Sequence, residues 1–269
     1  MPPMPSANLH RAAREALLTP DPDAKIALTR QLEADWRAGR LAAEPVEIEA
    51  IPVPGRPARP ELVNPGRLPR RKPHTPEGHA ALIHAICHIE FNAINLALDA
   101  VYRFPGLPDD FYSDWLRVAR EEGEHFGLLR EHLGSLGYAY GDFPAHNGLW
   151  EAAVETDHDP LIRMALVPRV LEARGLDVTP GIMAKLEAIG DVRAVEILTV
   201  IQRDEVGHVA IGTRWFRHLC EQRNLEPETT FQSLLSASRQ GRIRGPLDRD
   251  ARRRAGFTEA ELDYLEGTG

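Results

Sequence analysis

One pattern of acidic and imidazole side chains occurs twice in this sequence and limits what the chain can fold into. In each copy a single glutamate is followed, 32 or 33 positions later, by the motif Glu-x-x-His. Residues three apart on a helix share a face, so each motif directs a carboxylate and an imidazole toward one point. The two copies predict four helices whose metal-ligand side chains face one core. The predicted metal ligands are Glu90, Glu122, His125, Glu172, Glu205 and His208.

A third Glu-x-x-His, from Glu155 to His158, is interpreted as coincidental. It spans an expected helix boundary before Asp159-Pro160 and has no upstream glutamate partner. The other two motifs lie in apolar stripes at helical spacing, where unneutralised carboxylates would be strongly destabilising. The alternative is that all six residues are solvated on helix surfaces. If they are buried, two divalent cations would balance about four glutamate charges, which couples metal binding to stability and proton release.

Composition and charge are those of a globular protein. The chain has 269 residues, of which 43% are hydrophobic and 27% are charged. No run of eighteen apolar residues occurs, and no basic segment followed by an apolar stretch begins the chain, so neither a membrane span nor a secretory signal is expected. Two cysteines, Cys87 and Cys220, favour a reducing, cytoplasmic location. The formal charge of −8 disfavours general nucleic-acid binding but allows a local basic patch.

Helix-start and helix-stop residues predict an all-α chain without long strands. Thr75, Asp159 and Asp191 are the expected N-terminal residues of three of the four long helices. The expected helices span residues 7–18, 22–38, 76–102, 109–136, 159–174, 180–189, 192–222, 228–240 and 258–266, with a long connection at 137–157. We predict one domain over 1–269, with an N-terminal helical segment at 1–44, a proline-rich arm at 45–75, a di-metal four-helix bundle at 76–222 and a C-terminal helical tail at 223–269.

Two acidic residues next to the predicted ligands are candidates for supporting them. Glu121 and Asp204 each directly precede a ligand glutamate, and ligating histidines usually donate their second N–H to a carboxylate. The alternative is that both are exposed helix charges. Pro168, four residues before Glu172, is expected to break one backbone hydrogen bond and bend its helix, either to open a pocket or only for packing.

Other chemically active residues are expected to be structural. His84 and His88 are four residues apart, but His88 lies about 200° around the helix from Glu90, so structural hydrogen bonds are favoured over a metal pair. Cys87 either lines the site or is a packed core thiol. Two basic segments either bind phosphates or pair with acidic faces. They contain Arg67, Arg70, Arg71 and Lys72, and Arg242, Arg244, Arg249, Arg252, Arg253 and Arg254.

The sequence resembles the ferritin-like superfamily of di-iron carboxylate proteins, and within it an uncharacterised bacterial family of unknown function. The resemblance covers about residues 50–222 and is carried by four stretches, HAICHIEFNAINLALDA, EEGEHFGLLREHL, MALVPRVLEARGLDVTP and DEVGHVAIGTRWF. The superfamily includes the tRNA hydroxylase MiaE, to which the family is distantly similar. The resemblance implies a ferritin-like four-helix bundle with two iron ions, or manganese or a mixed Fe/Mn pair, at the six predicted ligands. It does not supply a substrate.

We therefore expect an oxidoreductase that uses dioxygen to oxidise or hydroxylate an unidentified organic substrate, which is either a small molecule or RNA. An external electron donor is expected, because no flavin or iron–sulfur motif is present. The alternatives are iron handling with ferroxidase activity, for which the N-terminal arm argues against a cage, and a metal pair that only stabilises a scaffold. No catalytic residue beyond the metal ligands is predicted. The sequence leaves the oligomeric state open, with a homodimer as one alternative.

Overall fold

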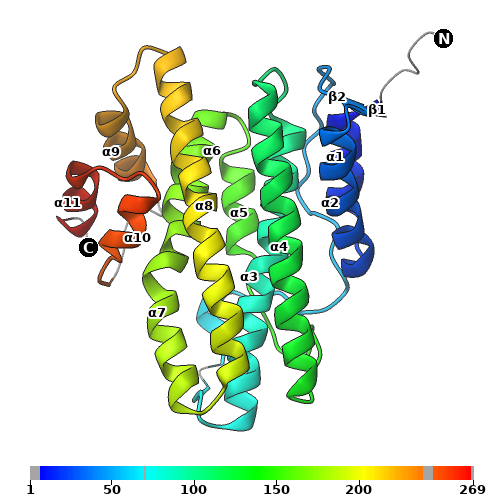
Figure 1. The fold of residues 1–269 in the computed structure, drawn as a ribbon, viewed down its shortest axis with the longest axis vertical. Helices are drawn as coiled ribbons and strands as arrows, with labels where there is room; N and C mark the ends of the chain where they lie inside the picture. The colour runs from blue at the N-terminus through cyan, green and yellow to red at the C-terminus, as the bar shows by residue number, and fades with distance from the viewer. Residues whose placement is uncertain (1–6, 70, 239–244, 268–269) are drawn as a thin grey trace. The chain divides into compact units, whose positions relative to one another are not determined.

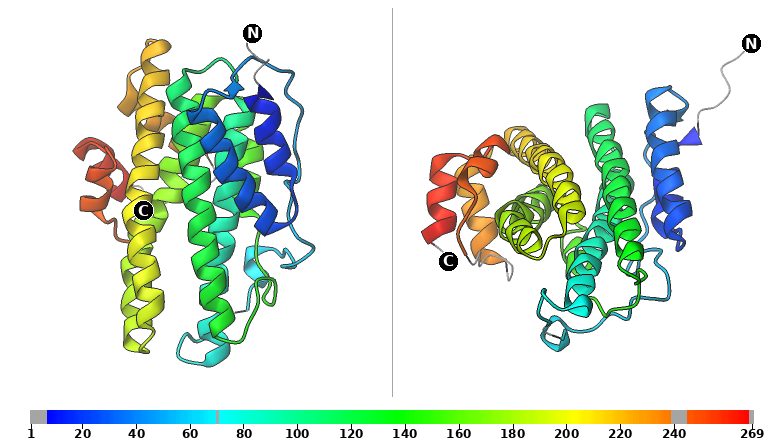
Figure 2. Two further views of the ribbon diagram at one scale, coloured as in Figure 1. Left: turned by 45° about the vertical axis from the view of Figure 1, so that its right-hand side comes forward. Right: turned by 60° about the horizontal axis from the view of Figure 1, so that its bottom comes forward.

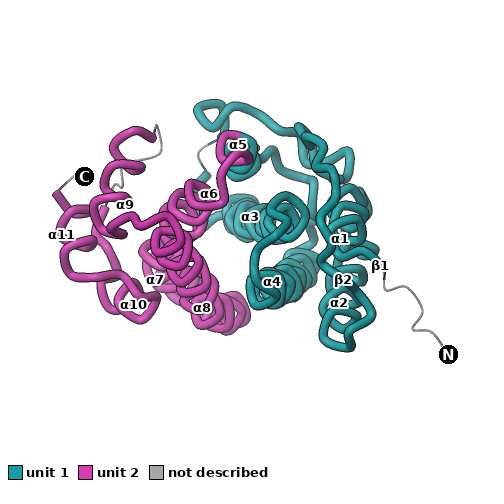
Figure 3. Tube along the Cα trace, turned by 90° about the horizontal axis from the view of Figure 1, so that it is seen from above, with its two compact units in different colours: residues 1–154 teal, residues 155–269 magenta. Residues whose placement is uncertain are grey.

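The computed structural model describes residues 7–69, 71–238 and 245–267, and nearly all its regular structure is helical (Figure 1). This confirms the all-α prediction. Two-residue strands are the exception: β1 (Ala7–Asn8) pairs in parallel with β2 (Leu41–Ala42). The chain divides into two compact units, residues 1–154 and 155–269 (Figure 3). The single-domain organisation expected from the sequence stays a prediction.

Unit 1 is built around a pair of long helices, α3 (Pro76–Arg103) and α4 (Asp109–Ser135). They are joined by residues 104–108 and pack along their lengths, while α1 (Leu9–Leu18) packs on α3 and α2 (Pro22–Arg37) packs on α4 (Figure 2). The Thr75 hydroxyl accepts a hydrogen bond from the Gly78 amide at 3.1 Å, as expected for the N-cap of α3. Helix α4 ends just before Gly137, whose φ of 83° favours glycine.

Helix α3 is the central helix of unit 1. Its composition and length would allow it to cross a membrane, but 72% of its most apolar window is buried inside the protein. The apolar residues at helical spacing around Glu90 are all buried, so this helix has an inward-facing apolar stripe. They are Ile83, Ile86, Cys87, Ala93, Ile94, Ala97 and Val101. This burial is typical of the core helix of a water-soluble protein.

The proline-rich arm runs along unit 1. The 3-10 helix η1 (Pro65–Arg67) is its only regular element within the described residues. The Trp150 indole donates a hydrogen bond to the Pro52 carbonyl at 3.1 Å, and the Val63 amide donates to the Ala145 carbonyl at 2.8 Å. Trp150 lies on α5 (Gly148–Glu155), a helix within the connection at 137–157 that the sequence analysis did not anticipate. Glu155 ends α5 and His158 follows it, so the third Glu-x-x-His does not lie on one helix.

Unit 2 differs from the prediction in the segment after Pro160. The expected end at Arg174-Gly175 and the separate helix at 180–189 are both wrong, because α6 (Pro160–Leu166), η2 (Val167–Glu172) and α7 (Ala173–Ala188) form one continuous segment. Pro180 lies inside α7, where it cannot donate to the Leu176 carbonyl. The Gln202 side chain donates to that carbonyl instead, at 3.1 Å. A distant side chain therefore satisfies the group that the proline leaves exposed.

Pro168 lies in η2, which is a π-helix. The loss of one backbone hydrogen bond at this proline was predicted, and the wider helix accommodates it. A Cβ added to Gly212 would lie 2.4 Å from the Pro168 ring, so glycine allows close packing here. Gly212 belongs to α8 (Val192–Gln222), which begins after the predicted N-cap Asp191. The tail contains α9 (Pro227–Ala237) and α11 (Glu259–Gly267), close to the expected helices, and a short helix α10 (Arg249–Arg254) that was not predicted.

Candidate metal centre

Three of the predicted ligands come together inside unit 1. Glu90 lies in the middle of α3, and Glu122 and His125 lie one turn apart on α4. The Nδ1 atom of His125 is 3.2 Å from Glu90 Oε2 and 3.3 Å from Glu122 Oε2. One possible ligand atom from each residue lies within 4.8 Å of the others. The exposed fractions of the three residues are 4%, 1% and 1%, so this triad is buried in the core.

The donor set of this triad fits a metal ion. Two carboxylates and one imidazole combine oxygen and nitrogen ligands that suit iron, manganese or zinc. A cation at this point would neutralise negative charge that is otherwise costly in an apolar core. The carboxylates come from two helices whose packing fixes their separation, so the ligand atoms are held close before a metal binds.

Unit 2 carries the other three predicted ligands. Glu205 and His208 are one turn apart on α8, with His208 Nδ1 3.6 Å from Glu205 Oε1. His208 is buried at 1% exposure, while the Glu205 side chain is 13% exposed. Glu172 is half-buried and is the last residue of the π-helix η2. Unit 2 thus repeats the local Glu-x-x-His geometry of unit 1, as the sequence predicted for a helix.

The two supporting acids contact arginines next to them in the chain. Glu121 accepts a hydrogen bond from Arg120 at 3.0 Å, and Asp204 accepts one from Arg203 at 2.9 Å. Their side chains are about one-fifth exposed, at 21% and 20%. These contacts agree with the alternative of helix charges near the surface, and the supporting role stays a prediction.

His84 and His88 form structural hydrogen bonds, as expected. The His84 Nε2 atom accepts from the Gly141 amide at 2.9 Å, which requires this nitrogen to be unprotonated. The His88 Nε2 donates to the His146 carbonyl at 3.1 Å, and its Nδ1 accepts from the Tyr140 hydroxyl at 2.8 Å. Both rings stack on Tyr140. These two imidazoles tie the segment after α4 to α3.

Cys87 is a packed core thiol. Its Sγ donates to the Phe126 carbonyl at 3.8 Å, and the residue is fully buried. Burial, followed by the nearby charge of Glu90, raises the pKa of the Cys87 thiol well above its usual range. A neutral thiol is a weak metal ligand, so Cys87 is not added to the ligand set.

The stability of metal-free protein is expected to fall as the pH drops from about 6.5 to 4. Burial lowers the pKa of both His84 and His88 from 6.5 to about 4 in the folded protein. The unfolded chain therefore binds more protons in this window, so acid favours unfolding by about 3 kcal/mol for each histidine. Urea unfolding at several pH values measures this slope. His84→Gln and His88→Gln variants should flatten it, and an unchanged slope in both variants would refute the assignment.

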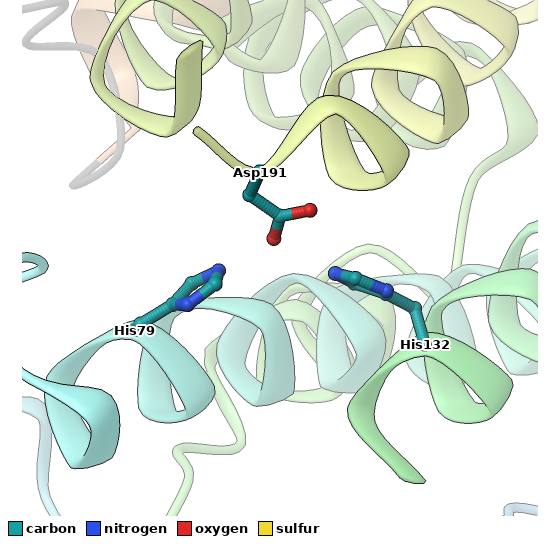
Figure 4. Close-up of side chains that lie close together, drawn as sticks. All are labelled: His79, His132 and Asp191. Atoms are coloured by element: carbon teal, nitrogen blue, oxygen red, sulfur yellow. The ribbon is translucent and has the colours of Figure 1, made fainter. Parts of the chain in front are cut away.

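A further pair of imidazoles was missed by the sequence analysis. His79 lies in the first turn of α3 and His132 in the last turn of α4, and Figure 4 shows their rings turned toward each other. The ring centroids are 6.5 Å apart. No motif joins these residues, and they meet because α3 and α4 are joined by a short loop and run side by side.

The described arginines of the basic segments are largely paired with acids. Arg71 donates to Glu77 at 3.0 Å and lies 5.1 Å from the centre of the Phe143 ring. In the tail, Arg249 bonds three carboxylates, Arg252 bonds Asp177, and Arg253 bonds two carboxylates. Arg70, Arg242 and Arg244 lie outside the described residues. For these arginines the ion pairs agree with the alternative that the basic segments pair with acidic faces. Nucleic-acid binding by the segments stays a prediction.

The molecule is an all-α protein with a buried cluster of carboxylates and histidine. It belongs to the family described as "Protein of unknown function (DUF455)", whose model matches residues 18–263. The chain is also 52% identical over 216 residues to an uncharacterized protein from Haemophilus influenzae, and the match covers 78% of this chain and 75% of that protein. No solved structure matches the chain. Membership of an uncharacterised family confirms that part of the sequence-based expectation.

Proposed function

We propose that this protein is a non-haem di-iron carboxylate protein with a ferritin-like four-helix bundle. The observation that carries the proposal is the buried triad of unit 1, where donor atoms of Glu90, Glu122 and His125 lie within 4.8 Å of one another. The repeated Glu and Glu-x-x-His pattern supports a second, equivalent triad in the same bundle. The proposed ligands of the two ions are Glu90, Glu122, His125, Glu172, Glu205 and His208.

We further propose that the protein is an oxidase or hydroxylase that uses dioxygen on an organic substrate. Bound iron would supply the redox chemistry, with electrons from an external donor. The chain would contribute the geometry: carboxylates from two helices fix the metal position, and the buried apolar residues of α3 and α4 exclude bulk water. The π-helix that ends at Glu172 supports this function, because such irregular turns are frequent at functional sites.

The distant similarity to the tRNA hydroxylase MiaE belongs to the same proposal and makes RNA one substrate class to test. Binding of an RNA substrate should weaken as the salt concentration rises, because phosphate contacts release counterions. The alternatives of ferroxidase activity and of a purely structural metal pair predict different reactions of the ferrous protein.

Oxygen uptake by ferrous protein is the prediction that tests this function. Metal-free protein is loaded anaerobically with two Fe(II) per chain and mixed with oxygenated buffer, while oxygen and visible absorbance are followed. We expect rapid oxygen uptake that is lost in Glu122→Ala. The matched control is Glu124→Ala, which removes a more exposed carboxylate bonded to Arg120 from the same helix.

The outcomes separate the functional classes. Uptake that stops after one turnover and does not resume with a reductant would indicate iron handling. Retained iron with no oxygen uptake would indicate a structural role. If Glu122→Ala consumed oxygen as the unaltered protein does, the assignment of this ligand would be wrong.

A further inference from the structure

A cationic hollow in unit 2 is distinct from the predicted metal ligands. It has a volume of about 450 Å³ and is lined by residues of α8 and by the end of α10. Five of the lining residues are titratable, and three of these are arginines. They are Arg214, Arg217, His218, Glu221 and Arg254. The volume falls in the range of small-molecule sites, so it can hold more than a single ion.

The shape of the hollow is fixed by the turn that follows α10. Gly256 has a φ of 88°, and a Cβ added there would lie 3.2 Å from the Thr213 methyl group. Glycine therefore allows this turn to lie against α8. The Gly256 carbonyl accepts a hydrogen bond from Arg217 Nη2 at 2.6 Å, which holds the arginine at the hollow. Arg214 is one turn earlier on the same face of α8, over the Trp215 ring.

The charge balance at the hollow differs from that of the surrounding tail. Arg249, Arg252 and Arg253 are each neutralised by carboxylates. Arg217 bonds a carbonyl, which leaves its charge uncompensated, and no carboxylate among the described residues pairs with Arg254. The chain as a whole carries a formal charge of −8, so uncompensated arginines that line one hollow are not a general property of its surface.

We propose that this hollow binds the phosphoryl group of a small phosphorylated molecule. Guanidinium groups match phosphate oxygens with two parallel hydrogen bonds, which is stronger and more directional than a lysine contact. His218 offers one further donor, because its buried Nε2 has no hydrogen-bond partner within the described part of the chain. Glu221 lines the same hollow and can accept a hydrogen bond from a ligand hydroxyl.

Titration calorimetry with inorganic phosphate and inorganic pyrophosphate tests the proposal on the full chain as purified. We expect saturable binding that weakens at least tenfold in the double variant Arg217→Gln/Arg254→Gln. The control for charge is Arg193→Gln, which removes one arginine from an exposed ion pair at the start of α8, and it is compared with each single variant, Arg217→Gln and Arg254→Gln. The control variant should bind like the unaltered protein, and circular dichroism checks that all variants are folded.

Several results would overturn the proposal. No binding to the unaltered protein would do so, as would equal binding by the double variant, which would place the anion at another site such as a metal centre. Equal weakening in Arg193→Gln would mean that only net charge matters. A short single-stranded RNA is the last ligand tested: if phosphate and pyrophosphate do not bind and RNA binding is lost in the double variant, the hollow would be assigned to nucleic acid instead.

Discussion

Replacing Glu122 with alanine is expected to abolish most metal binding. The substitution should not lower the stability of metal-free protein, but it should remove the stabilisation that bound metal provides. In metal-free protein the variant should be as stable as the unaltered chain or more stable, because it removes a buried carboxylate. With metal at about 1,000 times its dissociation constant, the unaltered protein should gain about 4 kcal/mol and the variant almost none. Thermal unfolding with and without Mn(II), together with metal analysis, measures both effects.

The expected sign of the change in stability, measured on metal-free Glu122→Ala protein, makes this prediction specific. A residue that only packs the core would lower stability in both conditions when it is truncated. Glu124→Ala, on the same helix, removes a more exposed carboxylate that bonds Arg120 and serves as the matched control. If Glu122→Ala lowered the stability of the metal-free protein and left metal binding intact, Glu122 would be a structural residue.

Loss of Arg169, one of the buried arginines of unit 2, is expected to be strongly destabilising. Arg169 is fully buried in η2, and its guanidinium lies over three phenylalanine rings at 4.1 to 4.7 Å from their centres. Its Nη2 donates to Glu261 Oε1 at 2.5 Å. Burial lowers the pKa of Arg169, and the Glu261 charge opposes this effect. Arg169→Met would leave Glu261 buried without its cation, at a cost of about 3–5 kcal/mol.

Substitution of Glu261, the ion-pair partner of Arg169, allows the contribution of the ion pair to be separated from that of the other Arg169 contacts. Glu261 also forms a capping box at the start of α11, where its carboxylate accepts from the Thr258 amide at 3.0 Å. Glu261→Gln keeps one acceptor oxygen in place of two, so it can retain one of these two hydrogen bonds and should cost less than Arg169→Met. In the double variant the two losses should not add, because they share one ion pair. Urea unfolding measures all three variants, and a loss below about 1 kcal/mol in Arg169→Met would contradict the account.

Local signals predicted much of the fold because they act within one or two turns. Thr75, Asp159 and Asp191 each accept a hydrogen bond from an amide two or three residues ahead, so their positions mark helix starts. The inward stripes of α3 and α4 follow from helical spacing alone. For the same reason the geometry of each Glu-x-x-His motif, and the burial of Glu90, could be expected from the sequence.

Features that depend on distant residues were not predicted. The helix continues through Pro180 because Gln202, from α8, donates to the carbonyl that the proline leaves free. The three phenylalanine rings and the glutamate that surround Arg169 come from α8, α9, the turn before α11 and α11 itself. No sequence spacing indicates that these segments meet. The His79–His132 pair likewise depends on how α3 packs against α4.

The most direct test of the central claim is a titration of metal-free protein with Mn(II), followed by equilibrium dialysis and electron paramagnetic resonance. Two carboxylate-rich triads that share one pair of ions predict two Mn(II) per chain and a spectrum of exchange-coupled ions. One ion or none per chain would contradict the claim, as would two ions with the spectra of isolated Mn(II).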